Sequence, residues 1–319
     1  MPITPKRPPL SGAGAADGIG FAVARLLAGT GHPVALAAIP IFMFDRAAEL
    51  SSSGFEDSAH VGNLTIAADM AWLCAKVGAV EALVDNAGIG TQSRPALEKH
   101  LVDIGEAEWD HEVAVSPKTA FMVTRAFLPA MLAAGYGRTV NVASVTGPYG
   151  SMPGASPYSA AKAGMIGLTH SPALEVAACG VIVNAAGPGW IETGASTSAE
   201  RDAARKTPPG RAGRADEVAA AIVFLASPAA SCVNGAVIVV DGSSMDRGNM
   251  PLVAKRSPPP GQRAPGAAAT RALTKPADSY NTSAHGRPVG VRWIQWSRTG
   301  WWWGSCCMAT LLRPARFTA

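Results

Sequence analysis

The segment SGAGAADGIG, residues 11–20, is followed directly by the apolar run FAVARLL at residues 21–27. Glycines in such a loop let the backbone approach a diphosphate closely. The N-terminus of a following helix adds free N–H groups and the positive end of the helix dipole. A glycine-rich turn without a ligand is the alternative interpretation. Because a helix follows the loop directly, we favour a dinucleotide-binding start to the fold.

Outward from this segment, short β-branched runs alternate with longer helical stretches as far as Asp241. Such alternation is typical of βαβ units wound around a parallel sheet. We expect strands at residues 34–39, 82–85, 138–143, 181–184 and 236–240. We expect helices at residues 20–28, 106–134, 158–177 and 216–226. The predicted fold class is therefore α/β, with a doubly wound parallel sheet and helices on both of its faces.

The composition changes sharply after Met250, so we divide the chain into a domain at residues 1–250 and a tail at residues 251–319. The tail is a low-complexity segment rich in proline, alanine and tryptophan, and we expect it to be disordered. It carries 10 Lys or Arg residues against the single Asp278, a net charge of +9. Its arginines and tryptophans could bind single-stranded nucleic acid or a membrane interface. We favour an appendage without such a role.

The cysteines and the apolar runs indicate the compartment. The chain has 5 cysteines, an odd number, without metal-ligand spacing or an even disulfide framework. Its first residues lack the apolar region of a secretory signal. The longest apolar run, at residues 34–44, contains Pro40 and is too short to cross a bilayer. We expect a soluble cytoplasmic protein without a metal site.

Tyr158 and Lys162 lie four residues apart in the segment SPYSAAKAG, residues 156–164. This spacing places a phenol and an ammonium on one face of a helix. We expect the nearby cation to lower the phenol pKa from its ordinary value of about 10. Tyr158 could then exchange a proton with a carbonyl or an alcohol. A solvated helix pair is the alternative, and the spacing alone does not exclude it.

Several motifs together resemble the classical short-chain dehydrogenase/reductase family. They are GIG at residues 18–20, DNAG at 85–88, Ser144, the pair Tyr158 and Lys162, and GPG at 187–189. The resemblance covers residues 11–245 and is nearest to the 3-oxoacyl-(acyl-carrier-protein) reductase group. It implies a Rossmann-type fold and an NAD(P)-dependent oxidoreductase that interconverts a carbonyl and an alcohol by hydride transfer. It also implies a small-molecule substrate and a homo-oligomer, either a dimer or a tetramer, with no nucleic-acid or membrane partner.

The resemblance also assigns roles to single residues. Tyr158 would be the general acid and base, and Lys162 would lower its pKa and hold the nicotinamide ribose. Ser144 would orient the substrate oxygen. Ser116 takes the place of an asparagine that anchors a proton-relay water. Tyr158 and Lys162 would also contact the cofactor, together with Ser11, Gly12, Gly14, Gly18, Ile19, Gly20, Asn63, Leu64, Asn86, Ala87, Gly88, Pro188, Gly189, Ile191 and Thr193.

The sequence departs from the family pattern mainly on the cofactor side. Four prolines in residues 1–9 predict a first strand that is short or poorly paired. Asn63 stands where an aspartate usually contacts adenine, and Asp85 replaces an asparagine. Residues 39–44 are apolar where a polar residue normally reads the ribose 2′ position. The cofactor is therefore NADP or NAD, and the resembled group favours NADP.

Two further expectations follow. The segment at residues 190–211 is long and rich in small residues, which predicts a mobile lid over the substrate. The proline-rich first strand and Ser116 also leave a second function open, a catalytically impaired nucleotide-binding protein on the same fold.

Overall fold

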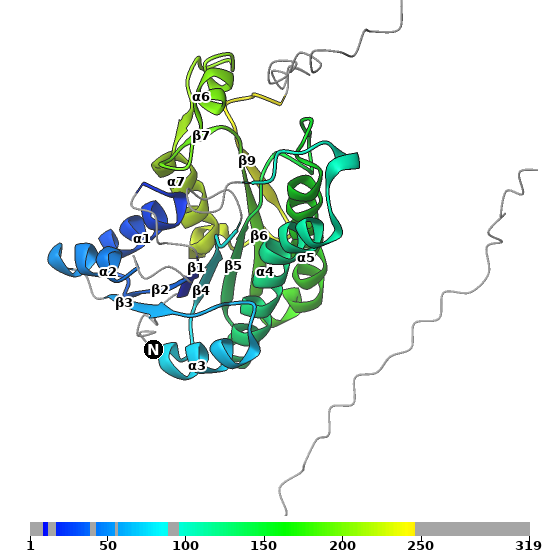
Figure 1. Cartoon of the computed structure of the whole chain (residues 1–319). Coiled ribbons are helices and arrows are strands. Elements are labelled where there is room, and N and C mark those ends of the chain that lie inside the picture. The colour runs from blue at the N-terminus through cyan, green and yellow to red at the C-terminus, as the bar shows by residue number, and fades with distance from the viewer. Residues whose placement is uncertain (1–8, 12–16, 39–42, 55–56, 89–95, 246–319) are drawn as a thin grey trace, which may run out of the picture. The chain divides into compact units, whose positions relative to one another are not determined.

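The computed structural model describes residues 9–11, 17–38, 43–54, 57–88 and 96–245. The predicted tail lies outside these residues, and so do Gly12 and Gly14. Within the described residues, seven parallel strands form one sheet in the order β3-β2-β1-β4-β5-β6-β9 (Figure 1). These strands are β1 Pro9–Ser11, β2 Val34–Ala38, β3 Asp57–Val61, β4 Ala82–Asp85, β5 Gly137–Val142, β6 Val181–Pro188 and β9 Val237–Val240.

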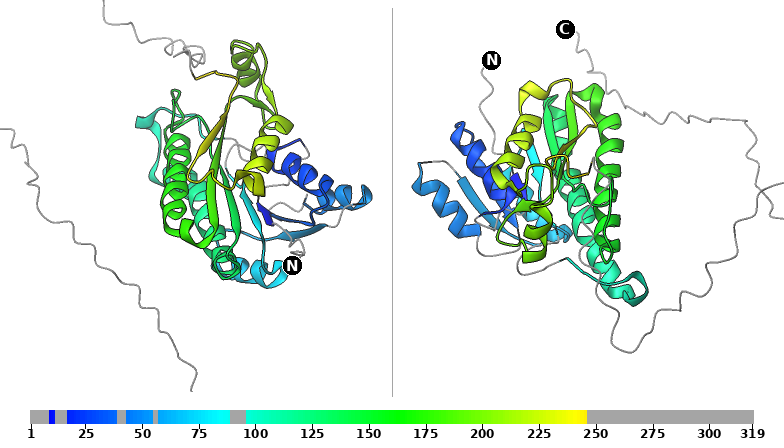
Figure 2. Two further views of the ribbon diagram at one scale, coloured as in Figure 1. Left: turned by 180° about the vertical axis from the view of Figure 1, so that it is seen from behind. Right: turned by 90° about the horizontal axis from the view of Figure 1, so that it is seen from above.

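Helices cover both faces of this sheet. The long connections are α1 Ile19–Gly29, α2 Met43–Ser52, α3 Ala67–Val77, α4 Glu106–Ala134, α5 Ser156–Val176 and α7 Ala215–Ala226. Helices α1, α2 and α7 lie on one face, and α3, α4 and α5 on the other (Figure 1; Figure 2). The remaining described elements are the 3-10 turns η1 Leu101–Asp103, η2 Ala177–Cys179 and η3 Pro228–Ala230, the helix α6 Ser198–Ala204, and the paired strands β7 Ile191–Glu192 and β8 Gly213–Arg214.

Two apolar layers hold the helices to the sheet, because neighbouring strand residues point to opposite faces. In β2, Leu36 joins the layer beneath α1 and α7, which also contains Phe21 and Ile222. The next residue, Ala37, joins the layer beneath α3, α4 and α5, which contains Phe127. All five β2 residues are buried, as expected for a strand covered on both faces. The predicted doubly wound α/β fold is therefore confirmed.

The first strand is short, as its prolines predict. Strand β1 has three residues and lies between β2 and β4, with Leu10 in register with Leu36 on one side and Val84 on the other. Pro9 stands at its first residue, a position that a proline tolerates in a strand. The strand order reverses between β1 and β4. In parallel sheets of this kind the ligand crevice lies at the carboxyl ends of the strands at such a reversal.

The sequence located most of the elements. The bounds of α4 agree with the prediction, and the five expected strands are present with small differences at their ends. Strand β6 is longer than expected and continues to Pro188, where it pairs with Val240 of β9. The elements α2, β3 and α3 were not predicted. Within the described residues, no helix is both long and apolar enough to cross a membrane.

Asn184 links β6 to the segment that precedes β9. It is fully buried, its Nδ2 donates to the Val233 carbonyl at 2.6 Å, and its Oδ1 accepts the Ala236 N–H at 2.9 Å. Asn184→Ala leaves both backbone groups without these partners. We expect it to lower the free energy of unfolding by about 2–4 kcal/mol, as measured by urea denaturation. The exposed Ser52→Ala control should change it by less than about 0.5 kcal/mol, and equal effects would contradict this account.

Candidate active site

Ser144 and Tyr158 are brought together at the end of β5. Ser144 follows the last residue of β5 by two positions, and Tyr158 lies in the first turn of α5. Pro157 suits this first turn, where a missing N–H costs nothing. Ser144 Oγ accepts the Thr146 N–H at 3.0 Å, and the Ser144 side chain lies close enough to Tyr158 to lower the pKa of the phenol. These two side chains therefore lie together at the end of β5.

Lys162 lies one helical turn beyond Tyr158 and is almost entirely buried, with 5% of its surface exposed. Its Nζ donates to the Val142 carbonyl at 2.9 Å, at the last residue of β5. The same Nζ lies 3.7 Å from Met165 Sδ and 5.8 Å from the centroid of the Tyr158 ring. Lys162 therefore connects α5 to β5 directly beneath the tyrosine.

Burial changes the acidity of this ammonium. Removal from water lowers the pKa of Lys162 from 10.5 to about 8, and the charge of Asp85 partly opposes the change. Asp85 is itself buried at the end of β4. At pH 7 the ammonium remains charged, because the lowered pKa is still above that pH. The site therefore contains a buried cation that can release its proton more easily than an ordinary lysine.

The expectation that Lys162 lowers the pKa of Tyr158 is wrong for this structure. Burial raises the pKa of Tyr158 above 10, and the charges of Glu200 and Glu112 raise it further. The interaction with the Ser144 side chain lowers it. The four-residue spacing predicts a contact between the ammonium and the hydroxyl, but it carries no information on how far the fold removes the phenol from water. In this structure Tyr158 is a neutral phenol at pH 7, ready to donate a proton.

Ser116 and Gly88 complete this cluster from two other elements. A Cβ added to Gly88, which follows β4, would lie 3.1 Å from Ser116 Oγ and 3.4 Å from Lys162 Nζ. Glycine therefore leaves room for these two groups at the end of β4. Ser116 is 1% exposed on α4, and α4 continues as a helix through Pro117. The four predicted catalytic residues, Ser116, Ser144, Tyr158 and Lys162, thus lie around the carboxyl ends of β4 and β5.

The start of α1 fits a phosphate group. Gly18 is the N-cap residue, and within the described part of the chain no side chain caps this helix. Its first N–H groups are therefore available to an anion. Ile19 begins the helix, and Gly20 is buried in its first turn. Ser11 ends β1 in register with Asp85, next to the ends of β4 and β5.

The other predicted cofactor residues lie along the same edge of the sheet. Asn86, Ala87 and Gly88 follow β4 directly. Asn63 and Leu64 lie in the turn after β3, where Asn63 Oδ1 accepts the Thr65 N–H at 3.0 Å and Leu64 is buried. The side-chain amide oxygen of Asn63 therefore stabilises the turn in which Asn63 itself lies. Their contact with a cofactor stays a prediction.

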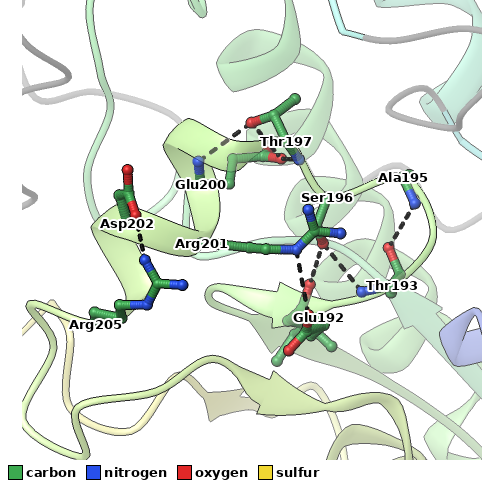
Figure 3. A network of polar contacts seen from close by, with 10 residues as sticks. Glu192, Thr193, Ala195, Ser196, Thr197, Glu200, Arg201, Asp202 and Arg205 are labelled. Atoms are coloured by element: carbon green, nitrogen blue, oxygen red, sulfur yellow. Dashed lines mark hydrogen bonds and ion pairs between the residues drawn. The ribbon is translucent and has the colours of Figure 1, made fainter.

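Pro188, Gly189, Ile191 and Thr193 follow one another from the end of β6 into β7 and the next turn. A Cβ on Gly189 would lie 2.6 Å from the Asp241 Cβ, which explains the glycine. Thr193 donates its N–H to Ser196 Oγ at 3.0 Å and accepts the Ala195 N–H at 3.3 Å (Figure 3). Thr193 is therefore held in a defined turn after β7.

The segment predicted to be a lid contains regular structure. It includes β7 and α6, and Arg201 Nε of α6 lies 3.2 Å from Glu192 Oε1 of β7 (Figure 3). The Thr197 hydroxyl caps α6 by accepting the Glu200 N–H at 3.2 Å. These contacts fold the segment onto itself. Its movement over a substrate stays a prediction.

One buried acid near the cluster, Glu112, was not predicted as a site residue. Glu112 lies one helical turn before Ser116 on α4 and is 6% exposed. Burial raises its pKa, while a hydrogen bond from the Leu97 backbone and the nearby His111 oppose the change. Its charge also acts on Tyr158. Its spacing could have indicated this position, because residues four apart, such as Glu112 and Ser116, lie on one face of a helix.

Comparison with known proteins identifies the family. A sequence profile described as Enoyl-(Acyl carrier protein) reductase matches residues 12–243. The chain belongs to the short-chain dehydrogenase/reductase family. The resemblance inferred from the motifs is thereby confirmed, and so is the enzyme class. This short-chain dehydrogenase/reductase is an NAD(P)-dependent oxidoreductase that acts on alcohol and carbonyl groups.

Three similar proteins illustrate the relationship. The chain is 39% identical over 237 residues to cis-4-hydroxycyclohexanecarboxylate dehydrogenase of Sinomonas cyclohexanicum, covering 72% of this chain and 93% of that protein. It is 43% identical over 171 residues to 3-oxoacyl-(acyl-carrier-protein) reductase of Thermotoga maritima, covering 52% and 67%. A gluconate 5-dehydrogenase structure from Burkholderia cenocepacia, in complex with NADP and tartrate, has a TM-score of 0.69 at 29% identity, covering 76% and 96%. None of these similarities supports the alternative of an impaired binding protein.

Lys162 should reduce the stability of the unliganded protein at neutral pH, because its charge is buried. Lys162→Met removes this charge, but it also removes the cation that balances buried Asp85, so we predict how the free energy of unfolding changes with pH and not its value at pH 7. Between pH 8 and 10.5 the unfolded chain keeps a proton that folded Lys162 has released. Wild-type stability therefore gains relative to the variant across this window.

Urea denaturation at several pH values measures this difference. The exposed Lys76→Met on α3 serves as the control and should show no such pH-dependent gain. A wild-type stability that does not rise relative to Lys162→Met between pH 8 and 10.5 would contradict the account of a desolvated ammonium.

Proposed function

We propose that the protein is a reductase of 3-oxoacyl thioesters in which Tyr158 is the general acid. The placement of the Ser144 and Tyr158 side chains together, beside the buried ammonium of Lys162, is the observation that carries this proposal. This placement would let both hydroxyl groups donate hydrogen bonds to one carbonyl oxygen of a substrate. The reductase named among the similar proteins supports the thioester class. The cyclic hydroxy acid dehydrogenase supports a second candidate, oxidation of a ring alcohol that carries a carboxylate.

The proposed chemistry starts from a neutral Tyr158 phenol and a charged Lys162 ammonium. The carbonyl oxygen of the substrate accepts hydrogen bonds from Ser144 Oγ and Tyr158 Oη, which orient it and stabilise developing negative charge. A nicotinamide bound at this site would supply the hydride. Tyr158 gives its proton to the oxygen as the alcohol forms, and the positive charge of Lys162 stabilises the resulting phenolate. In alcohol oxidation the same phenolate accepts the proton.

The residues present fit a dinucleotide. The uncapped start of α1 at Gly18 would bind the diphosphate, and Asn86 to Gly88 would line the adenosine side. Pro188 and Thr193 would lie at the nicotinamide. We propose NADP(H) as the preferred cofactor, in keeping with the resembled reductase group and with the NADP-bound structural relative. Initial rates with NADPH and NADH at equal concentrations test this preference.

We propose a homo-oligomer, a dimer or a tetramer, in the cytoplasm. The long helices offer apolar side chains to solvent, with Phe121 on α4 47% exposed and Leu174 on α5 84% exposed. Such side chains on adjacent helices suit contact with a second copy. The described cysteines, Cys74, Cys179 and Cys232, are free thiols, which suits a reducing compartment.

Replacement of Tyr158 tests the function. We expect Tyr158→Phe to lower kcat/KM for acetoacetyl-CoA with NADPH at least about 100-fold, because the general acid is lost. The melting temperature should stay close to the wild-type value. The control is Tyr136→Phe, since Tyr136 lies beside the start of β5, at the opposite end of that strand from Ser144. The same assay with cis-4-hydroxycyclohexanecarboxylate and NAD⁺ distinguishes the two substrate classes.

Wild-type activity on the ring alcohol but not on the thioester would overturn the thioester proposal and leave the role of Tyr158 intact. Turnover in Tyr158→Phe at the wild-type rate would overturn that role.

A further inference from the structure

The turn after β3 lies where the topology of the sheet directs the base of a dinucleotide. The strands run in the order β3-β2-β1-β4-β5, and the catalytic cluster lies at the ends of β4 and β5. A dinucleotide with its diphosphate at the start of α1 and its nicotinamide at Tyr158 therefore extends its other half over β2 and β3. The Gly62 N–H donates to the carbonyl of Ala38, the last residue of β2, at 3.1 Å. This bond fixes the turn beside the strand end that faces the second ribose.

Asn63 in this turn has one fixed side-chain orientation. Its Oδ1 accepts the Thr65 N–H at 3.0 Å and the Thr65 hydroxyl group at 2.7 Å. A backbone N–H can only donate, so the amide atom that faces it is the oxygen and not the nitrogen. The Asn63 N–H donates to Asp69 Oδ2 at 2.7 Å, which holds the backbone of the turn to α3. Rotation of the amide group would therefore break two hydrogen bonds.

This orientation leaves Asn63 with hydrogen-bond donors alone. An amide oxygen has two lone pairs, and the two groups of Thr65 occupy both of them. Among the residues that the structure describes, none accepts a hydrogen bond from Asn63 Nδ2. The side chain is only partly buried. The two protons on Nδ2 are therefore available to a ligand at this turn.

Donors alone do not suit the amino edge of adenine. An asparagine that recognises adenine uses both ends of its amide, since the oxygen accepts from the 6-amino group while the nitrogen donates to N7. In Asn63 the oxygen is occupied by Thr65, and an N–H group that faces the 6-amino group of adenine sets a donor against a donor. A 6-oxopurine has an acceptor oxygen at that position, next to the N7 acceptor. The Asn63 amide therefore complements a 6-oxopurine better than it complements adenine.

We propose that the protein binds a dinucleotide with a 6-oxopurine base at least as tightly as the corresponding adenine dinucleotide, and that Asn63 determines this selectivity. The proposal rests on the dinucleotide site of the proposed function. It adds a selectivity for the purine, set at the end of β3 on the opposite side of β1 from Ser144 and Tyr158.

Fluorescence titration of the unliganded protein measures this selectivity without a substrate. The probes are NADPH and deamino-NADPH, in which hypoxanthine, a 6-oxopurine, replaces adenine. The two molecules differ only at the 6-substituent and N1 of the purine, so the contributions of the phosphates, riboses and nicotinamide cancel in the ratio of their Kd values. We expect the wild-type Kd of deamino-NADPH to be equal to or lower than that of NADPH. Tighter binding of NADPH by the wild type would overturn the proposal.

Asn63→Asp restores an acceptor at this position. One carboxylate oxygen can still accept the bonds from Thr65, and the other can accept from the 6-amino group of adenine. We expect the ratio of Kd values to move about tenfold toward NADPH, because a hydrogen bond to a charged group replaces a contact between two donors. A ratio that stays at the wild-type value in a variant with the wild-type melting temperature would overturn the role of Asn63.

Substitutions of Thr65 provide a matched pair that leaves Asn63 in place. Thr65→Val removes one of the two donors that occupy Oδ1, so the ratio should move toward NADPH by less than it does in Asn63→Asp. Thr65→Ser keeps both donors and should give the wild-type ratio. Equal ratios in these two Thr65 variants would contradict the occupied oxygen on which the proposal depends.

The outcomes for this proposal and for the proposed function are separable. If neither dinucleotide binds, the dinucleotide site fails and this proposal fails with it. If both bind in the expected ratio and the protein does not reduce acetoacetyl-CoA, the thioester proposal is overturned and the selectivity assigned to Asn63 stands.

Discussion

The hydrogen bond from Lys162 Nζ to the Val142 carbonyl connects the chemistry of this protein to its fold. It takes a charged side chain out of water and fixes it at the end of β5, next to the central β4. A buried charge is unfavourable unless it is bonded and balanced. Asp85 at the end of β4 supplies part of that balance, and Gly88 leaves the space that the ammonium needs.

The site follows from this one constraint. Helix α5 must lie close enough to β5 for the lysine to reach the strand end, and this brings Tyr158 over the ammonium and against Ser144. Burial then affects the two groups in opposite directions. It favours a neutral phenol, and it weakens the hold of the lysine on its proton. The result is a proton donor near the substrate position with a second exchangeable proton beneath it.

Much of this arrangement can be read from the sequence. The four-residue spacing of Tyr158 and Lys162 predicts their shared helix face, and the alternation of strands and helices predicts the parallel sheet that carries them. The prolines before Ser11 predict the short β1. The elements α2 and β3 escaped prediction because they are short and rich in polar residues, and α3 was not recognised despite its apolar residues. The residues that would read the ribose 2′ position, 39–42, lie outside the described part of the chain.

The pKa values could not be predicted in the same way. The direction of the change at Tyr158 depends on how completely the folded chain excludes water, which is a property of tertiary packing and is absent from local spacing. Glu112 illustrates the same limit. As part of a sequence it is one more acid on a polar helix, and as part of the fold it is a buried carboxyl group beside the catalytic cluster.

The most direct test of this account is the pKa of Lys162 itself. An NMR titration of the unliganded protein with ¹³C-labelled lysine side chains, assigned with Lys162→Met, follows each ammonium separately. The account predicts that the Lys162 signal titrates with a pKa of about 8, while exposed lysines titrate near their usual value of about 10.4. A Lys162 signal that titrates together with the exposed lysines would contradict the buried ammonium on which the proposed site depends.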